Sequence, residues 1–117
     1  MKRPTILSLC IASLALVALP ISAATGNVKA GEKLYQDFCQ SCHGEKGEGN
    51  PAAYKKAKAK IVHLGSEEAQ AKTDDSIRKV MTEGFGKMDK VEDLENAQQV
   101  EDVLAFVRTL RLKPPSK

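Results

Sequence analysis

The stretch Cys39-Gln40-Ser41-Cys42-His43, followed by Gly44, decides how the whole sequence is interpreted. In a helix, residues three positions apart lie on one face, so the Cys39 and Cys42 thiols would point to the same side. The imidazole of His43 follows directly after the second thiol. Five consecutive residues therefore deliver two sulfur groups and one imidazole to a single place.

Three kinds of chemistry use such a set. C-x-x-C-H is the signature of covalent haem attachment, in which two thiols add to the vinyl groups and the histidine binds the iron axially. A thiol–disulfide redox pair is expected within a βαβ pattern, which this chain lacks. Zinc usually takes four ligands, and His63 is the only other histidine, so a zinc site would also need a carboxylate. The pattern favours one thioether-linked haem c, with Cys39, Cys42 and His43 as its binding residues.

The first part of the chain has the pattern of a secretory signal. A short basic stretch precedes an apolar run over residues 6–19, and small residues follow. We predict a signal peptide over residues 1–24, cut after Ala24 or after Ala23, and a mature domain over residues 25–117. The apolar run is too short for a transmembrane span, and no second one follows. We therefore expect export to the periplasm and no membrane insertion of the mature chain.

Cleavage would change the cysteine count and the charge. Cys10 lies inside the apolar run and would be discarded with it, and Lys2 and Arg3 are the only charged residues lost. The mature chain would then have 16 basic and 15 acidic residues, a net charge of +1. This balance argues against nucleic acid or a membrane surface as a partner. Lysines gather at positions 55, 56, 58 and 60 and acids at 92, 93, 95, 101 and 102, which is typical of solvated helix faces.

The residue patterns predict an all-α fold of four or five short helices. Asn27 can cap a first helix over residues 28–38, and Asn50 with Pro51 can open a helix that runs to Lys60. Gly31 lies inside the first helix, where glycine costs about 1 kcal/mol relative to alanine. Close approach of another helix would explain why it is there.

Two further helical segments follow, separated by a loop. Ser66 can start one short turn, and Thr73 with two following acids can start a helix that Gly84 ends. Its inward stripe consists of Ile77, Val80 and Met81. From Gly84 to Leu94 the helical pattern lapses into a loop that contains Met88.

The last helix has the clearest pattern. Asn96 caps it, and Gln99 stands three residues later, as in a capping box. Pro114 and Pro115 would stop it. The residues with helical spacing along its apolar face are Val100, Val103, Leu104, Val107 and Leu110, with Phe106 on the flank.

Taken together, these residues resemble a known family. The order Gly31, Leu34-Tyr35, the Cys39–His43 motif with Gly44, a later methionine loop, and a helix ending Val103-Leu104-Ala105-Phe106-Val107-Arg108 is similar to the class I bacterial monohaem cytochromes c. The resemblance covers almost the whole mature chain. It implies a fold wrapped around one haem, with the first and last helices crossing where Gly31 meets Phe106.

The resemblance also implies the iron ligands, His43 on one side and a methionine on the other. Met88 matches the family's position, although Asp89 stands where the family usually has proline. Met81 lies on an inward helix stripe, where methionine is more often core filling, and His63 would give a bis-histidine site. The family orients its histidine through a proline carbonyl, for which Pro51 is the nearest match.

These features predict an electron carrier and not an enzyme. A haem with both axial positions filled by His43 and Met88 suits transfer of single electrons between larger redox proteins. We expect a periplasmic dehydrogenase or a quinol-oxidising complex on one side, a terminal oxidase or reductase on the other, and a monomeric carrier. Two alternatives stay open: a haem enzyme or sensor with a labile sixth site, which Asp89 keeps possible, and the haem subunit of a larger dehydrogenase.

Overall fold

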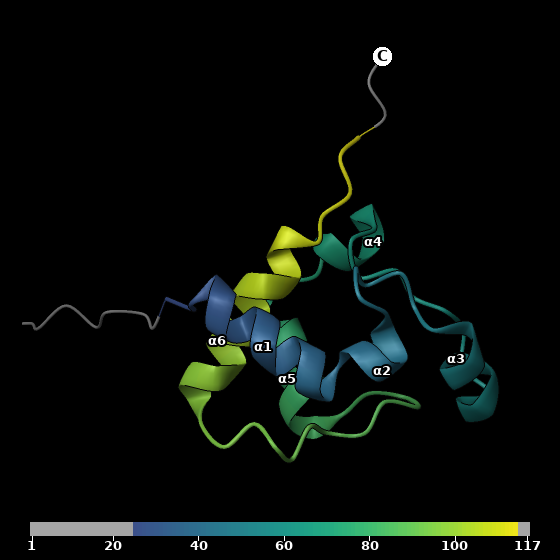
Figure 1. The fold of residues 1–117 in the computed structure, drawn as a ribbon, viewed down its shortest axis with the longest axis horizontal. Coiled ribbons are helices and arrows are strands. Elements are labelled where there is room, and N and C mark those ends of the chain that lie inside the picture. Colours follow the sequence, from purple (N-terminus) through teal and green to yellow (C-terminus); the bar gives the residue numbers. More distant parts are fainter. Residues whose placement is uncertain (1–24, 115–117) are drawn as a thin grey trace, which may run out of the picture.

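The computed structural model describes residues 25–114 (Figure 1). Within that range the chain forms α1 (Val28–Phe38), α2 (Gln40–His43), α3 (Pro51–Ala57), α4 (Glu67–Gln70), α5 (Asp74–Glu83) and α6 (Ala97–Thr109). The extended pairing found there is one isolated bridge between Phe85 and Met88. The predicted all-α class is therefore confirmed. The predicted signal peptide and Cys10 lie outside the described residues.

Helices α1 and α6 cross and form the most extensive helix contact of the fold (Figure 1). At the crossing the backbone of Asp102 lies directly against Gly31, and a Cβ at Gly31 would overlap the Asp102 carbonyl oxygen. The expected close approach is thus confirmed, and the atoms nearest to Gly31 belong to the backbone of Asp102 and Val103. The Phe106 ring packs on Tyr35, with ring centroids 5.0 Å apart. A glycine is needed because two helix backbones touch there.

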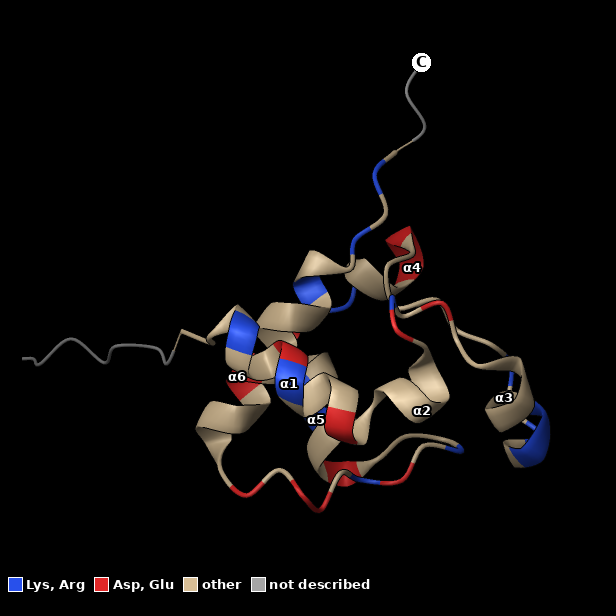
Figure 2. Ribbon diagram, viewed as in Figure 1, with Lys and Arg blue, Asp and Glu red and all other residues tan. Residues whose placement is uncertain are grey.

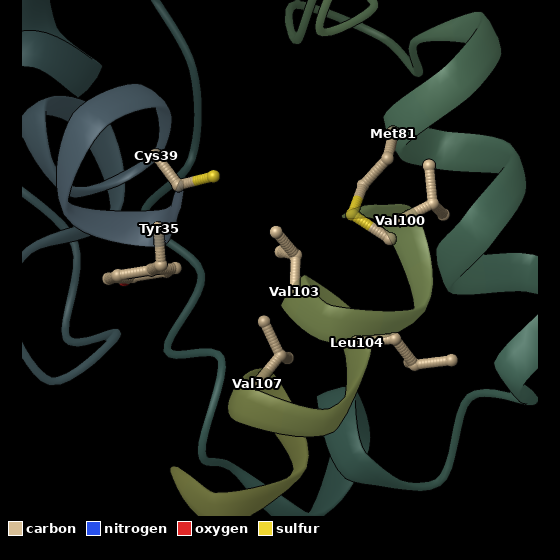
Figure 3. Close-up of a cluster of buried hydrophobic side chains, with 7 residues drawn as sticks. All are labelled: Tyr35, Cys39, Met81, Val100, Val103, Leu104 and Val107. Carbon is tan, nitrogen blue, oxygen red and sulfur yellow. The ribbon is translucent and has the colours of Figure 1, made fainter. Parts of the chain in front are cut away.

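The buried core is small and gathers around α6 (Figure 3). Val103 and Tyr35 are each only 1% exposed. The other buried apolar residues are Cys39, Met81, Val100, Leu104 and Val107. Four of the five apolar positions predicted for the last helix are therefore buried, and Leu110 packs against the cluster from its edge.

The ends of α6 differ in two details from the sequence expectation. Asn96 caps the helix as predicted, since its Oδ1 accepts from the Gln99 amide at 3.0 Å. The Gln99 side chain, however, accepts from the Glu95 amide at 2.7 Å and not from Asn96. The helix also ends at Thr109, well before Pro114. The chain turns away there, and the Leu112 amide donates to the Gly65 carbonyl at 2.9 Å.

Polar contacts of α6 hold the smaller helices in place. Arg108 donates to Asp74 at the start of α5 and to the carbonyl of Gln70 at the end of α4. Arg78 of α5 forms a two-pronged ion pair with Glu101. These arginines fix α4 and α5 against the helix that forms the core, because Arg78 joins α5 to α6 and Arg108 joins α6 to both α4 and α5.

Helix α3 lies apart from this core and is shorter than predicted. It ends at Ala57 and not at Lys60, because Lys58 takes a left-handed conformation with φ 52°. None of its residues is buried, so no tertiary packing extends it. The lysines of this segment lie at one extremity of the molecule, and the acidic residues between α5 and α6 lie elsewhere (Figure 2).

Candidate haem-binding site

The motif lies at a break between two helices. Cys39 follows the end of α1, and its φ of −117° interrupts the helical path before α2 begins at Gln40. The His43 amide donates back to the Cys39 carbonyl at 2.9 Å, so the motif forms one tight turn. Cys39 is buried, whereas Cys42 is exposed. The Cys39 sulfur points into the core, toward the side on which Met81 lies (Figure 3).

The two cysteines are free thiols, and the environment of Cys39 disfavours its ionisation. Burial, together with the neighbouring Cys42, raises the pKa of the Cys39 thiol to about 11. A catalytic dithiol needs the opposite, a lowered pKa that yields the reactive thiolate at neutral pH. The environment of Cys39 suits a sulfur held inside an apolar core.

The His43 ring is partly enclosed by α3. Its Nδ1 lies 3.3 Å from the Tyr54 hydroxyl, and the two rings meet edge to face at 81°. Burial lowers the pKa of His43, which favours the neutral imidazole. The neutral form is the one that coordinates a metal.

The partner of this ring nitrogen is the residue that sequence reasoning missed. Pro51, the expected source of an orienting carbonyl, occupies the first position of α3, and the contact to the ring comes from Tyr54. This contact is hard to predict from the sequence, because Tyr54 lies eleven residues after the histidine and that spacing does not indicate a contact. The turn between α2 and α3 brings the two together.

Met88 lies in a turn that closes on itself. The Met88 amide donates to the Phe85 carbonyl at 3.0 Å, and the Phe85 amide donates to the Met88 carbonyl at 2.9 Å. Gly84 permits this turn with φ +80°, where a Cβ would lie 2.8 Å from the Met88 carbonyl oxygen. The side chain of Met88 is half-buried, and the adjacent Phe85 is 75% exposed. The loop is ordered by hydrogen bonds although Asp89 replaces the family's proline.

The two alternative ligands have local roles. Met81 is 5% exposed and belongs to the core cluster, as its helix stripe predicted. His63 is half-buried, and its Nδ1 accepts a hydrogen bond from the Gly65 amide at 3.0 Å. Core packing accounts for Met81, and the Gly65 hydrogen bond accounts for His63, without either being an iron ligand. Met88 is not among the residues that form the buried cluster or pack against it.

The donor set fits a covalently attached haem. It offers two unpaired thiols on one turn, a neutral imidazole beside them, and an apolar interior into which one of the sulfurs points. Residues 25–114 contain no group of three or more His, Cys, Asp or Glu side chains that could hold a metal ion. The same range contains no helix that is long and apolar enough to cross a membrane.

Comparisons with known proteins place the chain in a class. Residues 26–107 match the model of a protein family described as cytochrome c oxidase, cbb3-type, subunit III. Among solved structures, the chain is similar to the KustC0563 c-type cytochrome, with 25% identity and a TM-score of 0.58 over 70% of this chain and 98% of that one. No protein with a curated function matches significantly.

Fold, motif and comparisons define a monohaem c-type cytochrome. More particularly, the chain belongs to the family of cytochrome c domains described as subunit III of cbb3-type cytochrome c oxidase. Membership gives haem-based electron transfer as its class of function and covalently bound haem c as its cofactor. The predicted c-type cytochrome family and covalently bound haem c are thereby confirmed, and the class I assignment stays a prediction.

Proposed function

We propose that this protein is an exported one-electron carrier whose single haem c is held by Cys39, Cys42, His43 and Met88. When bound, the haem supplies an iron that cycles between its ferric and ferrous states. The observation that carries the proposal is the turn from Cys39 to His43, which presents two free thiols and a neutral imidazole together. No other segment of the described chain offers such a set.

Each residue has a distinct task in this proposal. Cys39 anchors the group from inside the core, and Cys42 anchors it from the exposed side of α2. His43 would hold the iron through a ring nitrogen. Met88 would hold it through its sulfur, from a turn that both of its backbone hydrogen bonds hold in place.

Filling both axial positions favours electron transfer over catalysis. A site with no free coordination position has no place for a substrate, and a thioether ligand stabilises the reduced state. Apolar side chains around the site exclude water and act in the same direction. The core residues beside Cys39 are of this kind.

We further propose that the carrier works in the periplasm between larger redox proteins. The pattern of residues 1–24 supports export. The name of the matching family, an oxidase subunit, supports a terminal oxidase as acceptor. A periplasmic dehydrogenase or quinol-oxidising complex would be the donor. Size-exclusion chromatography of native membrane and periplasmic fractions separates a free monomer from a subunit of a larger assembly.

The test is a visible absorption spectrum of the exported protein and of two methionine variants. We expect a covalent low-spin haem that shows the weak far-red band of ferric iron–methionine bonding. Met88→Ala should abolish that band, whereas Met81→Ala, the matched control, should keep it and lose stability by about 2–5 kcal/mol because it empties part of the core.

Other spectra would overturn parts of the proposal. A haem without the band would remove Met88 as ligand, and carbon monoxide binding would then separate an open site from a His63-ligated one. A protein with no covalent haem would overturn the proposed function itself.

A further inference from the structure

The contact between Tyr54 and His43 depends on a series of backbone hydrogen bonds that bring α3 to the motif. The Gly49 amide donates to the His43 carbonyl at 2.7 Å, and the Asn50 amide donates to the Cys42 carbonyl at 2.8 Å. The Asn50 side chain donates to the Ser41 carbonyl at 2.9 Å. Three consecutive carbonyls of α2 therefore accept from the two residues that precede α3.

The same segment fixes the tyrosine within its helix. The Tyr54 amide donates to the Asn50 carbonyl at 3.0 Å, and the Ala59 amide closes the helix end on the Tyr54 carbonyl at 2.9 Å. Helix α3 buries none of its residues and is tied mainly to α2. Within α3 the half-buried Tyr54 is the residue whose side chain reaches the motif, through its hydroxyl at the His43 ring.

We propose that Tyr54 is a positioning residue for His43, and that its hydroxyl oxygen accepts a hydrogen bond from the ring Nδ1–H. This inference rests on the proposed function, in which His43 binds iron through Nε2. Coordination through Nε2 leaves the proton on Nδ1, so the phenol oxygen, 3.3 Å away, must be the acceptor. The bond fixes the ring orientation and the tautomer.

A phenol differs in strength from the acceptors that usually orient such a ligand. A carboxylate or a carbonyl draws the Nδ1 proton more strongly and makes the imidazole a better electron donor to the metal. A neutral phenol does this only weakly. Tyr54 therefore orients His43 but stabilises the ferric state less than a carboxylate or carbonyl would. Removing the Tyr54 hydroxyl should raise the reduction potential by only a small amount.

The experiment compares two variants of the haem-loaded protein, each of which deletes one hydroxyl. Tyr54→Phe removes the acceptor at the His43 ring. Tyr35→Phe, the matched control, removes a hydroxyl whose hydrogen bond goes to the Gly44 carbonyl at 2.6 Å and not to the ring. We expect Tyr54→Phe to raise the reduction potential. Solvent exchange of the His43 Nδ1 proton should become about tenfold faster, because one net hydrogen bond is lost. Tyr35→Phe should lower the unfolding temperature without either effect.

A measurement on the unaltered protein keeps the test decisive if Tyr54→Phe does not fold. In ¹⁵N-histidine-labelled reduced protein, the Nδ1 proton of His43 should show a nuclear Overhauser contact to the Tyr54 ring protons. Absence of that contact, or an unchanged potential and exchange rate in Tyr54→Phe, would overturn the role of Tyr54 while leaving the covalent haem spectrum intact. Absence of the covalent haem spectrum from the unaltered protein would overturn the proposed function as well.

Discussion

The two halves of this molecule are held together by different forces. Around the α1–α6 crossing, apolar side chains are buried and two helix backbones touch at Gly31. Around α3, no side chain of the helix is buried, and the contacts to the motif are hydrogen bonds. The first half therefore determines whether the chain folds. The second half determines how the candidate ligand His43 is oriented.

This difference predicts that equal chemical changes have unequal consequences in the two halves. A change at the crossing should lower the free energy of unfolding of the whole domain, because the core has few other members. A change around α3 should act locally, since that segment can open while the core stays folded. Two experiments test this contrast, beginning with the larger expected effect, and a third concerns the pH dependence of stability.

Gly31→Ala should be the most damaging of these changes. The added Cβ would overlap the Asp102 carbonyl oxygen, so the two helices must separate. We expect a loss of about 3 kcal/mol or more of unfolding free energy, although alanine is the better helix former by about 1 kcal/mol. Urea unfolding measures it. Ala30→Gly on the exposed side of the same helix is the control and should cost only about 1 kcal/mol. Equal losses in both variants would contradict the close crossing.

Replacing one capping asparagine in each half sharpens the comparison. Asn96 caps α6 through the Gln99 amide, and Asn50 caps α3 through the Ala52 amide at 3.1 Å. Each change to alanine removes about 1 kcal/mol of capping energy. Asn96→Ala should lower global stability by that amount, whereas Asn50→Ala should mainly accelerate hydrogen exchange in α3. The amides of α1 and α6, which exchange more slowly, should be unaffected by Asn50→Ala. An equal acceleration of hydrogen exchange in all three helices would show that the two halves unfold together.

The smallest effect concerns pH. The pKa of Glu48 is lowered by hydrogen bonds from backbone amides, including that of Lys46 at 2.7 Å. Since the folded-state pKa lies below the unfolded one, this carboxylate stabilises the fold above the ordinary glutamate pKa and loses that contribution as the pH falls through the folded value. Thermal unfolding of Glu48→Gln should therefore depend less on acid pH than that of the unaltered protein. Parallel curves for the two proteins would rule the contribution out.

Local sequence patterns were sufficient for most helices. Asn27, Thr73 and Asn96 cap the helices that they were predicted to cap, and the apolar spacing of the last helix identified its buried face. Such features are determined by neighbours within one or two turns, so they can be recognised in the sequence alone. The predicted extent of α3 was wrong at its end, because alternating alanine and lysine offer no apolar face to pack.

The sequence by itself determined the class of protein through the Cys39–His43 motif and the helices around it, because five adjacent residues carry that chemistry. Tertiary structure decided what those residues meet. It placed the Asp102 backbone against Gly31, and Tyr54 rather than a proline carbonyl against the His43 ring. It also placed Met81 in the core and held Met88 in a closed turn. Contacts between segments far apart in the chain depend on how the helices pack, and no local pattern records them.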